Sequence, residues 1–504
     1  MSSEPLERIS DMKDQNTITE TKTEQGNGTI SHEIEPTAEP TAEPPTEPPT
    51  MLPAEIPAEP PAERGLGNTQ GNEKNKTPQK ELKEEILKKV TVPGLSGSSN
   101  LGNTCYMNAS LQLTSATKPL LSYLIDKNSS IKKDIEQSIL DKLFSDHEKK
   151  NKENNSTEEL SISPEEIKTK ARQTITYQLR LVLKYMWAHN CEVEPKVFKR
   201  TVNKQLPFFN GMRQQDAQEF LTALLDKIHE NTKSQAKLIT NFSQRQVELE
   251  KNIKQIEERL EIARKSKENK SVIQSVINEL DTLYKENKDE YFSVRMIMVW
   301  KDILSASYSI INDIFSGTFL ITTICNTCKK EQHRFERFDI FMLHLPEEVE
   351  ADKQKYTITD LMKSYVTPET MTGKNTCFCD YCSEKTESVR QHLIYQQPNT
   401  LIVMIKKYQK FQGHIIKSNI KIEYDHELDI TPYMYSGSKG YKKYELYAVI
   451  RHSGGYSGGH YYSYTKNPIN DLWYLFDDGD VYNVDPSEAL NSNGYVLAYR
   501  IKQS

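Results

Sequence analysis

Two Cys-x-x-Cys pairs restrict the folds open to this 504-residue chain more than any other feature of its sequence. Cys325 and Cys328 form the first pair, and Cys379 and Cys382 form the second pair fifty residues later. One such pair alone could be a redox motif or a coincidence, but two pairs are a common ligand set for a structural, tetrahedral Zn²⁺ ion. Because β-like segments adjoin both pairs, we expect zinc to join these distant parts of the chain.

The other cysteines and the charge bear on the compartment and the partners of the chain. Residues 1–14 are polar and lack the apolar core of a secretory signal, and no segment reaches the roughly 18 apolar residues of a membrane helix. We therefore expect a cytoplasmic or nuclear protein whose seven cysteines are thiols or metal ligands. Cys377 is a possible stand-in ligand and Cys191 an ordinary thiol. The net charge of −6 indicates neither a nucleic-acid nor a membrane partner.

Residues 1–90 differ in composition from the rest of the chain. Pro, Thr, Ala and Glu recur between residues 36 and 63. Such a segment has little apolar surface to bury and cannot offset the entropy lost on ordering. The sequence therefore predicts a disordered tail over residues 1–90, more often a solvated spacer than a docking segment, and a folded domain over residues 92–502.

Helical patterns precede strand patterns within this domain. Residues 171–189 and 214–230 have the apolar spacing of amphipathic helices. In the first of them the residues expected near one face are Ile175, Leu179, Leu181, Val182, Tyr185 and Met186. From residue 314 onward, short runs rich in Ile, Tyr, Phe and Thr are separated by turns, which indicates strands. This order predicts an α+β fold with an antiparallel sheet.

Two polar stretches are predicted to be inserts in this fold. Residues 126–164 are rich in Lys, Glu, Asn and Ser, which is typical of a surface insert that is part helix and part loop. Residues 234–290 carry two apolar stripes of helical spacing around a short polar break. We expect an antiparallel helical hairpin that serves as a scaffold or binds a protein partner, because its ionisable groups all fall on solvated faces.

Cys105 is the first candidate for covalent chemistry, although a lone thiol is more often a small core residue. A Gly-Asn-Thr turn ends at Cys105, and a helical run follows. The sulfur would lie at a helix N-terminus, where the helix dipole and free N–H groups stabilise the nucleophilic thiolate. Backbone N–H groups of the turn, with the side chain of Asn100 or Asn103, could stabilise an oxyanion.

His460 and Asp477 are the candidates for the base and its orienting partner. His460 opens a β-like run directly after Gly458 and Gly459, and Asp477 follows seventeen residues later, next to Asp478. Two strands joined by a turn would bring the carboxylate beside the imidazole, as in a nucleophile–His–acid triad. Taken separately, His460 is as easily explained as a structural histidine, and the two aspartates as part of a turn.

Three motifs resemble, in the same order, those of the ubiquitin-specific proteases, a papain-like family of deubiquitinating enzymes. Residues 100–112 resemble the Cys box of the family, residues 214–220 its Gln-Gln-Asp motif, and residues 458–478 its His box. The resemblance extends from about residue 92 to residue 502. It departs from the family pattern in a longer opening before Asn100, in the two inserts, and at Cys377, where an aromatic residue is more typical.

The resemblance implies a thumb–palm–fingers fold and a role for each matching residue. A helical thumb would carry Cys105, and a β-sheet palm would carry His460 and Asp477. Asn100 would be the side-chain oxyanion donor, and Asp478 a supporting polar residue. The two Cys-x-x-Cys pairs would hold a structural zinc ion at the tip of the fingers.

The implied substrate is ubiquitin, attached to other proteins through a C-terminal tail that ends in two glycines. Gln214 and Asp216 would hold this tail, with Asp216 pairing with its arginines, and Gly458 and Gly459 would leave room for its glycines. The expected reaction is thiolate attack at the last Gly, formation of a thioester, and hydrolysis. The alternatives are a protein that binds ubiquitin without cutting it and a scaffold that works through the hairpin and the tail.

Overall fold

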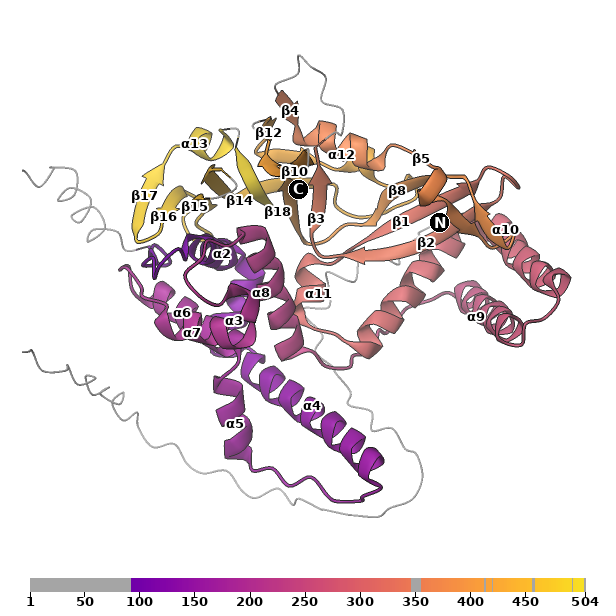
Figure 1. Ribbon diagram of the computed structural model, residues 1–504, viewed down its shortest axis with the longest axis horizontal. Coiled ribbons are helices and arrows are strands. Elements are labelled where there is room, and N and C mark those ends of the chain that lie inside the picture. The colour runs from indigo at the N-terminus through magenta and orange to yellow at the C-terminus, as the bar shows by residue number, and fades with distance from the viewer. Residues whose placement is uncertain are drawn as a thin grey trace, which may run out of the picture. The chain divides into compact units, whose positions relative to one another are not determined.

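The computed structural model describes residues 92–345, 355–411, 414–418, 420–455, 458–491 and 493–502 (Figure 1). The predicted disordered tail at residues 1–90 therefore lies outside the described residues. Within them, helices dominate up to residue 315 and strands dominate afterwards, which confirms the α+β class with mainly antiparallel sheets. None of the described helices is long and apolar enough to cross a membrane.

The thumb consists of helices grouped around the one that begins with Cys105 (Figure 1, indigo to magenta). Every residue of this central helix is buried, because it lies between the other thumb helices and the large sheet. The thumb helices are α2 (Cys105–Ala116), α3 (Lys118–Ile125), α4 (Ile131–Asn154), α5 (Pro164–Arg172), α6 (Ile175–Ala188), α7 (Lys196–Gln205) and α8 (Ala217–Thr232), with a 3₁₀ turn at Pro207–Phe209.

An eight-stranded sheet forms the palm. Seven of its strands follow the order β17-β16-β15-β14-β18-β9-β3, and β13 also pairs with β14. All neighbours are antiparallel except β3 and β9. The strands are β3 (Phe341–His344), β9 (Thr400–Lys406), β13 (Glu427–Asp429), β14 (Lys443–Gly454), β15 (Gly459–Lys466), β16 (Trp473–Asp477), β17 (Asp480–Val484) and β18 (Gly494–Ile501).

The palm is buried on both faces, and β9 shows why its sequence is apolar without interruption. Ile402 and Met404 belong to the core shared with the thumb, whereas Val403 between them belongs to the core on the opposite face. Successive side chains of a strand point to opposite faces, so both sets must be apolar. The helices α12 (Ile358–Val366) and α13 (Pro486–Leu490) contribute to this second core.

A four-stranded antiparallel sheet forms the fingers, in the order β2-β1-β8-β5. The first Cys-x-x-Cys pair lies where β1 turns into β2, and the second lies at the end of β6 and in the turn that leads to β7. The strands are β1 (Gly317–Cys325), β2 (Glu331–Phe338), β5 (Glu369–Met371), β6 (Cys377–Cys379), β7 (Glu384–Thr386) and β8 (Ser388–Gln396). Two further pairs are β4 (Lys355–Thr357) with β12 (Lys421–Glu423), and β10 (Tyr408–Phe411) with β11 (His414–Lys417).

The predicted helical hairpin is present, but its second helix is longer than expected. The hairpin consists of α9 (Gln244–Lys265) and α10 (Lys270–Ala306), and α10 passes the expected boundary at residue 290 without a break. Beyond that point Phe292 and Trp300 are buried in a core that includes Leu320 of the fingers. In this second half α10 packs against the fingers and still contacts α9, since Arg295 and Lys301 bond to Glu257 and Glu250 of α9.

Three other predicted elements differ from the structure in detail. The helix expected over residues 171–189 is divided, because α5 ends at Arg172 and the Thr174 side chain caps α6 by accepting the N–H of Tyr177. Leu181 and Tyr185 are 42% and 50% exposed, so their assignment to the buried face was wrong. At 100° per residue, Leu181 lies about 200° from Leu179, which is buried.

The strand expected from residue 314 begins only at Gly317, because Ile310–Phe315 form the short helix α11. The helix expected over residues 214–230 is α8, which begins at Ala217 because the Asp216 side chain caps it. Its apolar face is buried as the sequence predicts, from Phe220 to Ile228.

Candidate active site

Cys105 lies at the junction of a turn and a helix, as the sequence predicts, because it is the first residue of α2. The preceding turn is tight, since Gly102 and Asn103 both have left-handed backbone conformations, with φ of 98° and 54°. A Cβ atom on Gly102 would also lie 2.5 Å from the Met212 sulfur. The backbone conformation therefore favours glycine there, whereas the exposed Met212 side chain could move away from a Cβ atom.

The surroundings of the Cys105 thiol oppose the effect of the helix N-terminus, which by itself would lower the pKa of the thiol. The residue is buried, and α2 packs against β15 of the palm. Burial raises the pKa of the thiol, and the negative charge of Asp478 raises it further. A backbone hydrogen bond from Tyr461 lowers the pKa, but the net result is a pKa above the usual value. The helix N-terminus alone is thus insufficient to form the thiolate, and a base must take the proton.

His460 and Asp477 form a close pair on neighbouring strands. β15 and β16 are antiparallel, and the His460 ring at the start of β15 donates to the Asp477 carboxylate at the end of β16, with 2.5 Å between Nε2 and Oδ1. Asp478 Oδ2 lies 4.0 Å from the same ring nitrogen. Because Nε2 is engaged by Asp477, Nδ1 is the nitrogen left to exchange a proton with a thiol.

The Cys105 thiol and the His460 ring share one region without a direct bond. In the part of the chain that the structure describes, no hydrogen bond joins them, and the sulfur has backbone contacts with Tyr461, the residue after His460, and with Tyr106. Hydrogen bonds of catalytic groups are often long before a substrate is bound and tighten in the complex. We therefore expect a hydrogen bond between the ring and the thiol to form in the complex with substrate.

Asn100 and Asp478 belong to one hydrogen-bond network around the turn. Asn100 Oδ1 accepts the N–H groups of Gly102 and Thr104 at 3.1 and 3.0 Å, and Asn100 Nδ2 donates to Asp478 Oδ2 at 2.9 Å. Asn108, on the first turn of α2, donates to the other Asp478 oxygen at 2.8 Å. Asp478 thereby orients the Asn100 amide, whose second N–H remains available for an oxyanion.

Gln214 links the thumb to the palm beside His460. Its Nε2 donates to the Gly459 carbonyl at 2.8 Å, and its Oε1 accepts the Gly459 N–H at 2.7 Å. A Cβ atom on Gly459 would lie 2.2 Å from the His452 ring, whereas among the described residues one on Gly458 would meet Gln214 Oε1 alone, at 3.5 Å. Close packing thus requires a glycine at 459, and the contacts of Gln214 and both glycines with a ubiquitin tail remain predictions.

Asp216 has intramolecular partners for both oxygens. Oδ1 accepts the N–H groups of Gln218 and Glu219 at the start of α8, at 2.6 and 3.3 Å. Oδ2 accepts the hydroxyl of Tyr495 from β18 of the palm. These contacts assign the carboxylate a capping role, and its pairing with the arginines of a ubiquitin tail remains a prediction.

Three residues of this region were missed by the sequence analysis. Asn108 lies inside the Cys box as a polar residue in an otherwise buried helix, which was a usable signal. Gly97 lies against the loop after Asp477, where a Cβ atom would be 2.2 Å from the Gly479 carbonyl oxygen. No local pattern marks Gly97 or Tyr495, because their partners are hundreds of residues away in the sequence.

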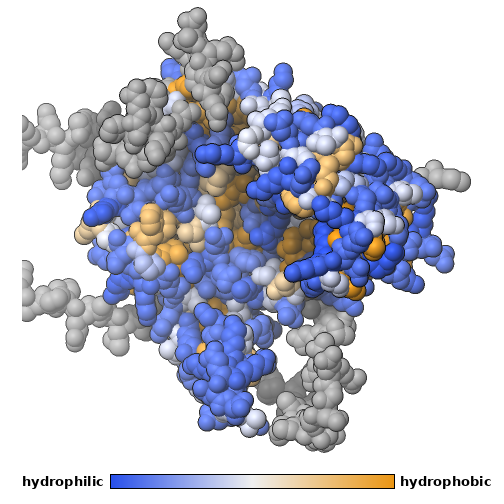
Figure 2. All heavy atoms as spheres, turned by 45° about the vertical axis from the view of Figure 1, so that its right-hand side comes forward, coloured by the Kyte–Doolittle hydropathy of each residue, from blue (hydrophilic) through white to orange (hydrophobic). Residues whose placement is uncertain are grey.

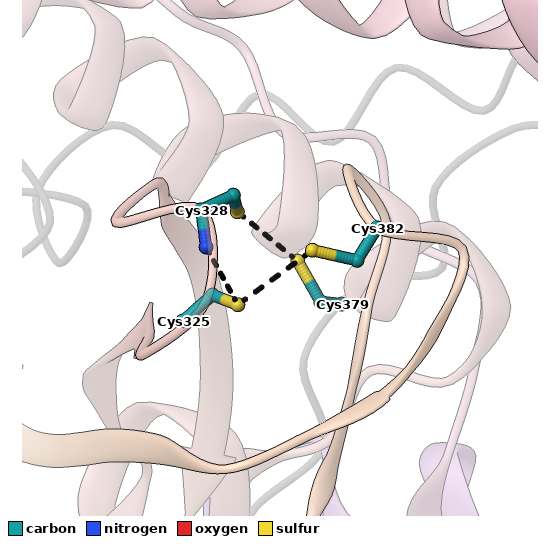
Figure 3. Close-up of side chains that lie close together, drawn as sticks. All are labelled: Cys325, Cys328, Cys379 and Cys382. Atoms are coloured by element: carbon teal, nitrogen blue, oxygen red, sulfur yellow. Dashed lines mark hydrogen bonds between the residues drawn. The ribbon is translucent and has the colours of Figure 1, made fainter.

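The four cysteines of the Cys-x-x-Cys pairs lie together at the tip of the fingers (Figure 3). Cys325 and Cys382 have their sulfurs 3.9 Å apart, and Cys328 and Cys379 have theirs 3.7 Å apart. All four sulfurs lie within 4.8 Å of one another, and Cys377 is not part of this group of described residues. The arrangement can hold a metal ion with four protein ligands and no open position.

Comparisons with known proteins agree with this geometry. The sequence model of a family described as ubiquitin carboxyl-terminal hydrolase matches residues 96–499. A probable ubiquitin carboxyl-terminal hydrolase of Acanthamoeba polyphaga mimivirus is 28% identical over 435 residues, which cover 81% of this chain and 90% of that protein. Ubiquitin carboxyl-terminal hydrolase 21 of Homo sapiens is 25% identical over 421 residues, and there the chain spans only 62% of its relative.

A solved structure supports the fold independently. It is the SAGA Ubp8/Sgf11/Sus1/Sgf73 DUB module bound to ubiquitin aldehyde, which matches 83% of this chain and 73% of that one with a TM-score of 0.51 and 17% identity. At that identity the match concerns the fold alone. Together with the family match over most of the chain, it shows that this chain belongs to the ubiquitin carboxyl-terminal hydrolase family, in its ubiquitin-specific protease branch.

Proposed function

We propose that this chain is a cysteine-type deubiquitinase that hydrolyses the isopeptide or peptide bond after the C-terminal Gly of ubiquitin. The observation that carries the proposal is that Cys105, at the start of α2, lies in the same region as the His460–Asp477 pair on β15 and β16, the two strands against which α2 packs. A nucleophile, a base and an orienting carboxylate in one place are the requirements of acyl transfer through a thioester.

The reaction follows from the roles of these three groups. His460 Nδ1 takes the Cys105 proton, and the sulfur adds to the carbonyl carbon of the last Gly. His460 returns the proton to the leaving amine as the C–N bond breaks, which leaves a thioester on Cys105. The ring then takes a proton from water, whose oxygen adds to the thioester carbonyl. The C–S bond breaks, the ring returns the proton to the Cys105 sulfur, and ubiquitin leaves with a free C-terminal carboxyl group. Asp477 holds the ring in its tautomer and stabilises the imidazolium.

The most direct test uses a ubiquitin with an electrophile at its C-terminus, followed by mapping of the modified residue. We expect one adduct, at Cys105, and none at the exposed Cys191. A fluorogenic ubiquitin C-terminal substrate then separates an enzyme from a protein that binds ubiquitin without turnover. If the chain bound ubiquitin tightly but formed no adduct and showed no turnover, the result would favour the alternative that it binds ubiquitin without cutting it.

We expect Asn100→Ala to lower kcat by about a hundredfold or more, with little change in ubiquitin affinity, because one donor to the oxyanion is lost. The structure adds an expectation about stability. The Asn100 side chain accepts two N–H groups of the turn, so the melting temperature should fall as well.

Asn108→Ala is the matched control, since it removes the other amide that donates to Asp478 without removing a donor to the oxyanion. Kinetics and melting temperature should be measured on both variants. A normal kcat for Asn100→Ala, with a lowered melting temperature, would show that the residue only caps the turn.

The metal that fits the four cysteines best is zinc, and we propose that it is structural. In a tetrahedral site with Zn–S bonds of about 2.3 Å, neighbouring sulfurs are about 3.8 Å apart. The sulfur distances of 3.7 and 3.9 Å fall on either side of that value. The ion would hold the β1–β2 turn against the β6–β7 ladder and take no part in the chemistry at Cys105.

We expect one zinc per chain, and we expect Cys328→Ser to destabilise the fingers rather than the active site, because ligation is coupled to local folding. Elemental analysis of the purified protein gives the stoichiometry, and the melting temperature with and without a chelator gives the stabilisation. Cys377→Ser is the control, because Cys377 lies outside the group. Purified protein without zinc would contradict the assignment.

We further propose that the hairpin binds a protein partner. The proposed location of the chain is the cytoplasm or the nucleus. The side chains of Val247, Ile262 and Val272 are exposed on the hairpin. Figure 2, which brings this side of the molecule forward, shows a mostly hydrophilic surface with small hydrophobic patches. Loss of a co-purifying protein on exchange of these three side chains for serine would identify such a partner.

A further inference from the structure

The helical hairpin contacts both Cys-x-x-Cys pairs from outside the metal site. α9 and α10 come close to the tip of the fingers where the cysteines lie (Figure 1). The hairpin is an insert in the family pattern, whereas the cysteines match that pattern.

The second pair is held by the end of α9. Asp380 lies between its two cysteines, and Arg264 Nη2, one residue before the end of α9, donates to Asp380 Oδ1 at 2.5 Å. The other oxygen of Asp380 accepts Gln332 Nε2 of β2 at 2.6 Å. Asp380 thus joins the second pair both to the hairpin and to the strand that follows the first pair.

The segment just after the first pair is held by the first third of α10. Lys330, two residues after Cys328, donates to Asp281 Oδ2 at 2.7 Å. The Asp281 side chain is only 10% exposed, and its oxygen also accepts Lys285 Nζ at 2.9 Å. Lys330 Nζ lies 5.4 Å from the centre of the Tyr381 ring, so the same lysine reaches the second pair.

Release of an ion from a closed four-cysteine site requires the two pairs to separate. A body that contacts both pairs in their closed arrangement stabilises that arrangement and slows the separation. Arg264 and Asp281 lie on the two helices of one hairpin and contact one pair each. Through the lysine and the aspartate beside the cysteines, the hairpin opposes opening without supplying a ligand.

We propose that the hairpin is a clasp on the metal site, in which Arg264 and Asp281 hold Asp380 and Lys330 and so slow the loss of the bound ion. This inference rests on the zinc site proposed above. It assigns a structural role to an insert that the family pattern lacks. By linkage, the ion in turn stabilises the docked hairpin.

The test is the rate at which the zinc-loaded, full-length protein releases zinc to an excess of a colorimetric chelator. We expect Arg264→Ala to accelerate release about threefold, as for a partly exposed ion pair. We expect Asp281→Asn to accelerate it about tenfold, because its carboxylate is largely buried beside the site. Hydrogen exchange should also rise in α9 and α10 when zinc is removed from the wild type.

Arg259→Ala is the matched control. Arg259 lies on the same helix and makes two bonds to Glu279 of α10, at 2.7 and 3.0 Å, but the structure shows no bond from it to the residues beside the cysteines in the described part of the chain. Wild-type release rates in the Arg264 and Asp281 variants, or equal acceleration by Arg259→Ala, would overturn the clasp alone. A wild-type protein without zinc would overturn the zinc site and the clasp together.

Discussion

Replacing Cys105 by alanine should abolish ubiquitin hydrolysis while leaving ubiquitin binding close to that of the wild type. The loss should be on the order of 10⁵-fold or more, because no thioester path remains without the sulfur. The residue is 4% exposed, so it contributes almost no area to a docking surface. Turnover of a fluorogenic ubiquitin substrate and the Kd for ubiquitin should be measured on the same preparation.

Cys191→Ala is the matched control for that variant, because Cys191 is an exposed thiol that is absent from the site. It should retain full activity. If pure Cys105→Ala protein still turned over the substrate, the assignment of Cys105 as the nucleophile would be wrong. Loss of ubiquitin binding with an unchanged melting temperature would show that the thiol region contributes to docking, against the geometry.

His460→Ala should be nearly as damaging as the loss of Cys105, and Asp477→Asn should be less damaging by about tenfold to a hundredfold. His460 must accept and return a proton in both halves of the reaction, whereas Asp477 orients the ring through its bond to Nε2. The raised pKa of the buried Cys105 thiol increases the need for the base. The measurement is kcat and kcat/KM for each variant.

His426→Ala is the control for the histidine variant, because His426 also faces a carboxylate, that of Glu445 at 3.4 Å, outside the site. It should be nearly silent. Near-native kcat in His460→Ala would require another base. If Asp477→Asn were silent and Asp478→Asn severe, the orienting role would belong to Asp478, whose carboxylate is 4.0 Å from the ring.

The parts of the active site that depend on local chain geometry could be predicted from the sequence. A Gly-Asn-Thr turn followed by a helical run placed Cys105 at a helix N-terminus, and the structure has it there. The alternation of strands and turns after residue 314 likewise indicated the sheets. These features are set by turn chemistry and by side-chain period, which act over a few residues.

The partners of the polar side chains could not be predicted in the same way. Gln214 binds Gly459, 245 residues later in the chain, and Asp216 accepts a hydroxyl from Tyr495. The family resemblance implied that both side chains hold a ubiquitin tail, and it gave no sign of these intramolecular partners. Only the order of the strands in the palm, together with the packing of the thumb on it, decides that they lie against β15 and β18.

The sequence by itself determined the class of fold, the candidate nucleophile and base, and the two cysteine pairs, because each depends on residue type and short spacing. The tertiary structure decided the pKa of the nucleophile and the hydrogen-bond partners of the polar side chains. Burial of α2 between the other thumb helices and the palm raises the pKa of Cys105, although the position of Cys105 at a helix N-terminus favours the thiolate. Burial and long-range pairing depend on which distant segments pack together, and that information is absent from any short window of the sequence.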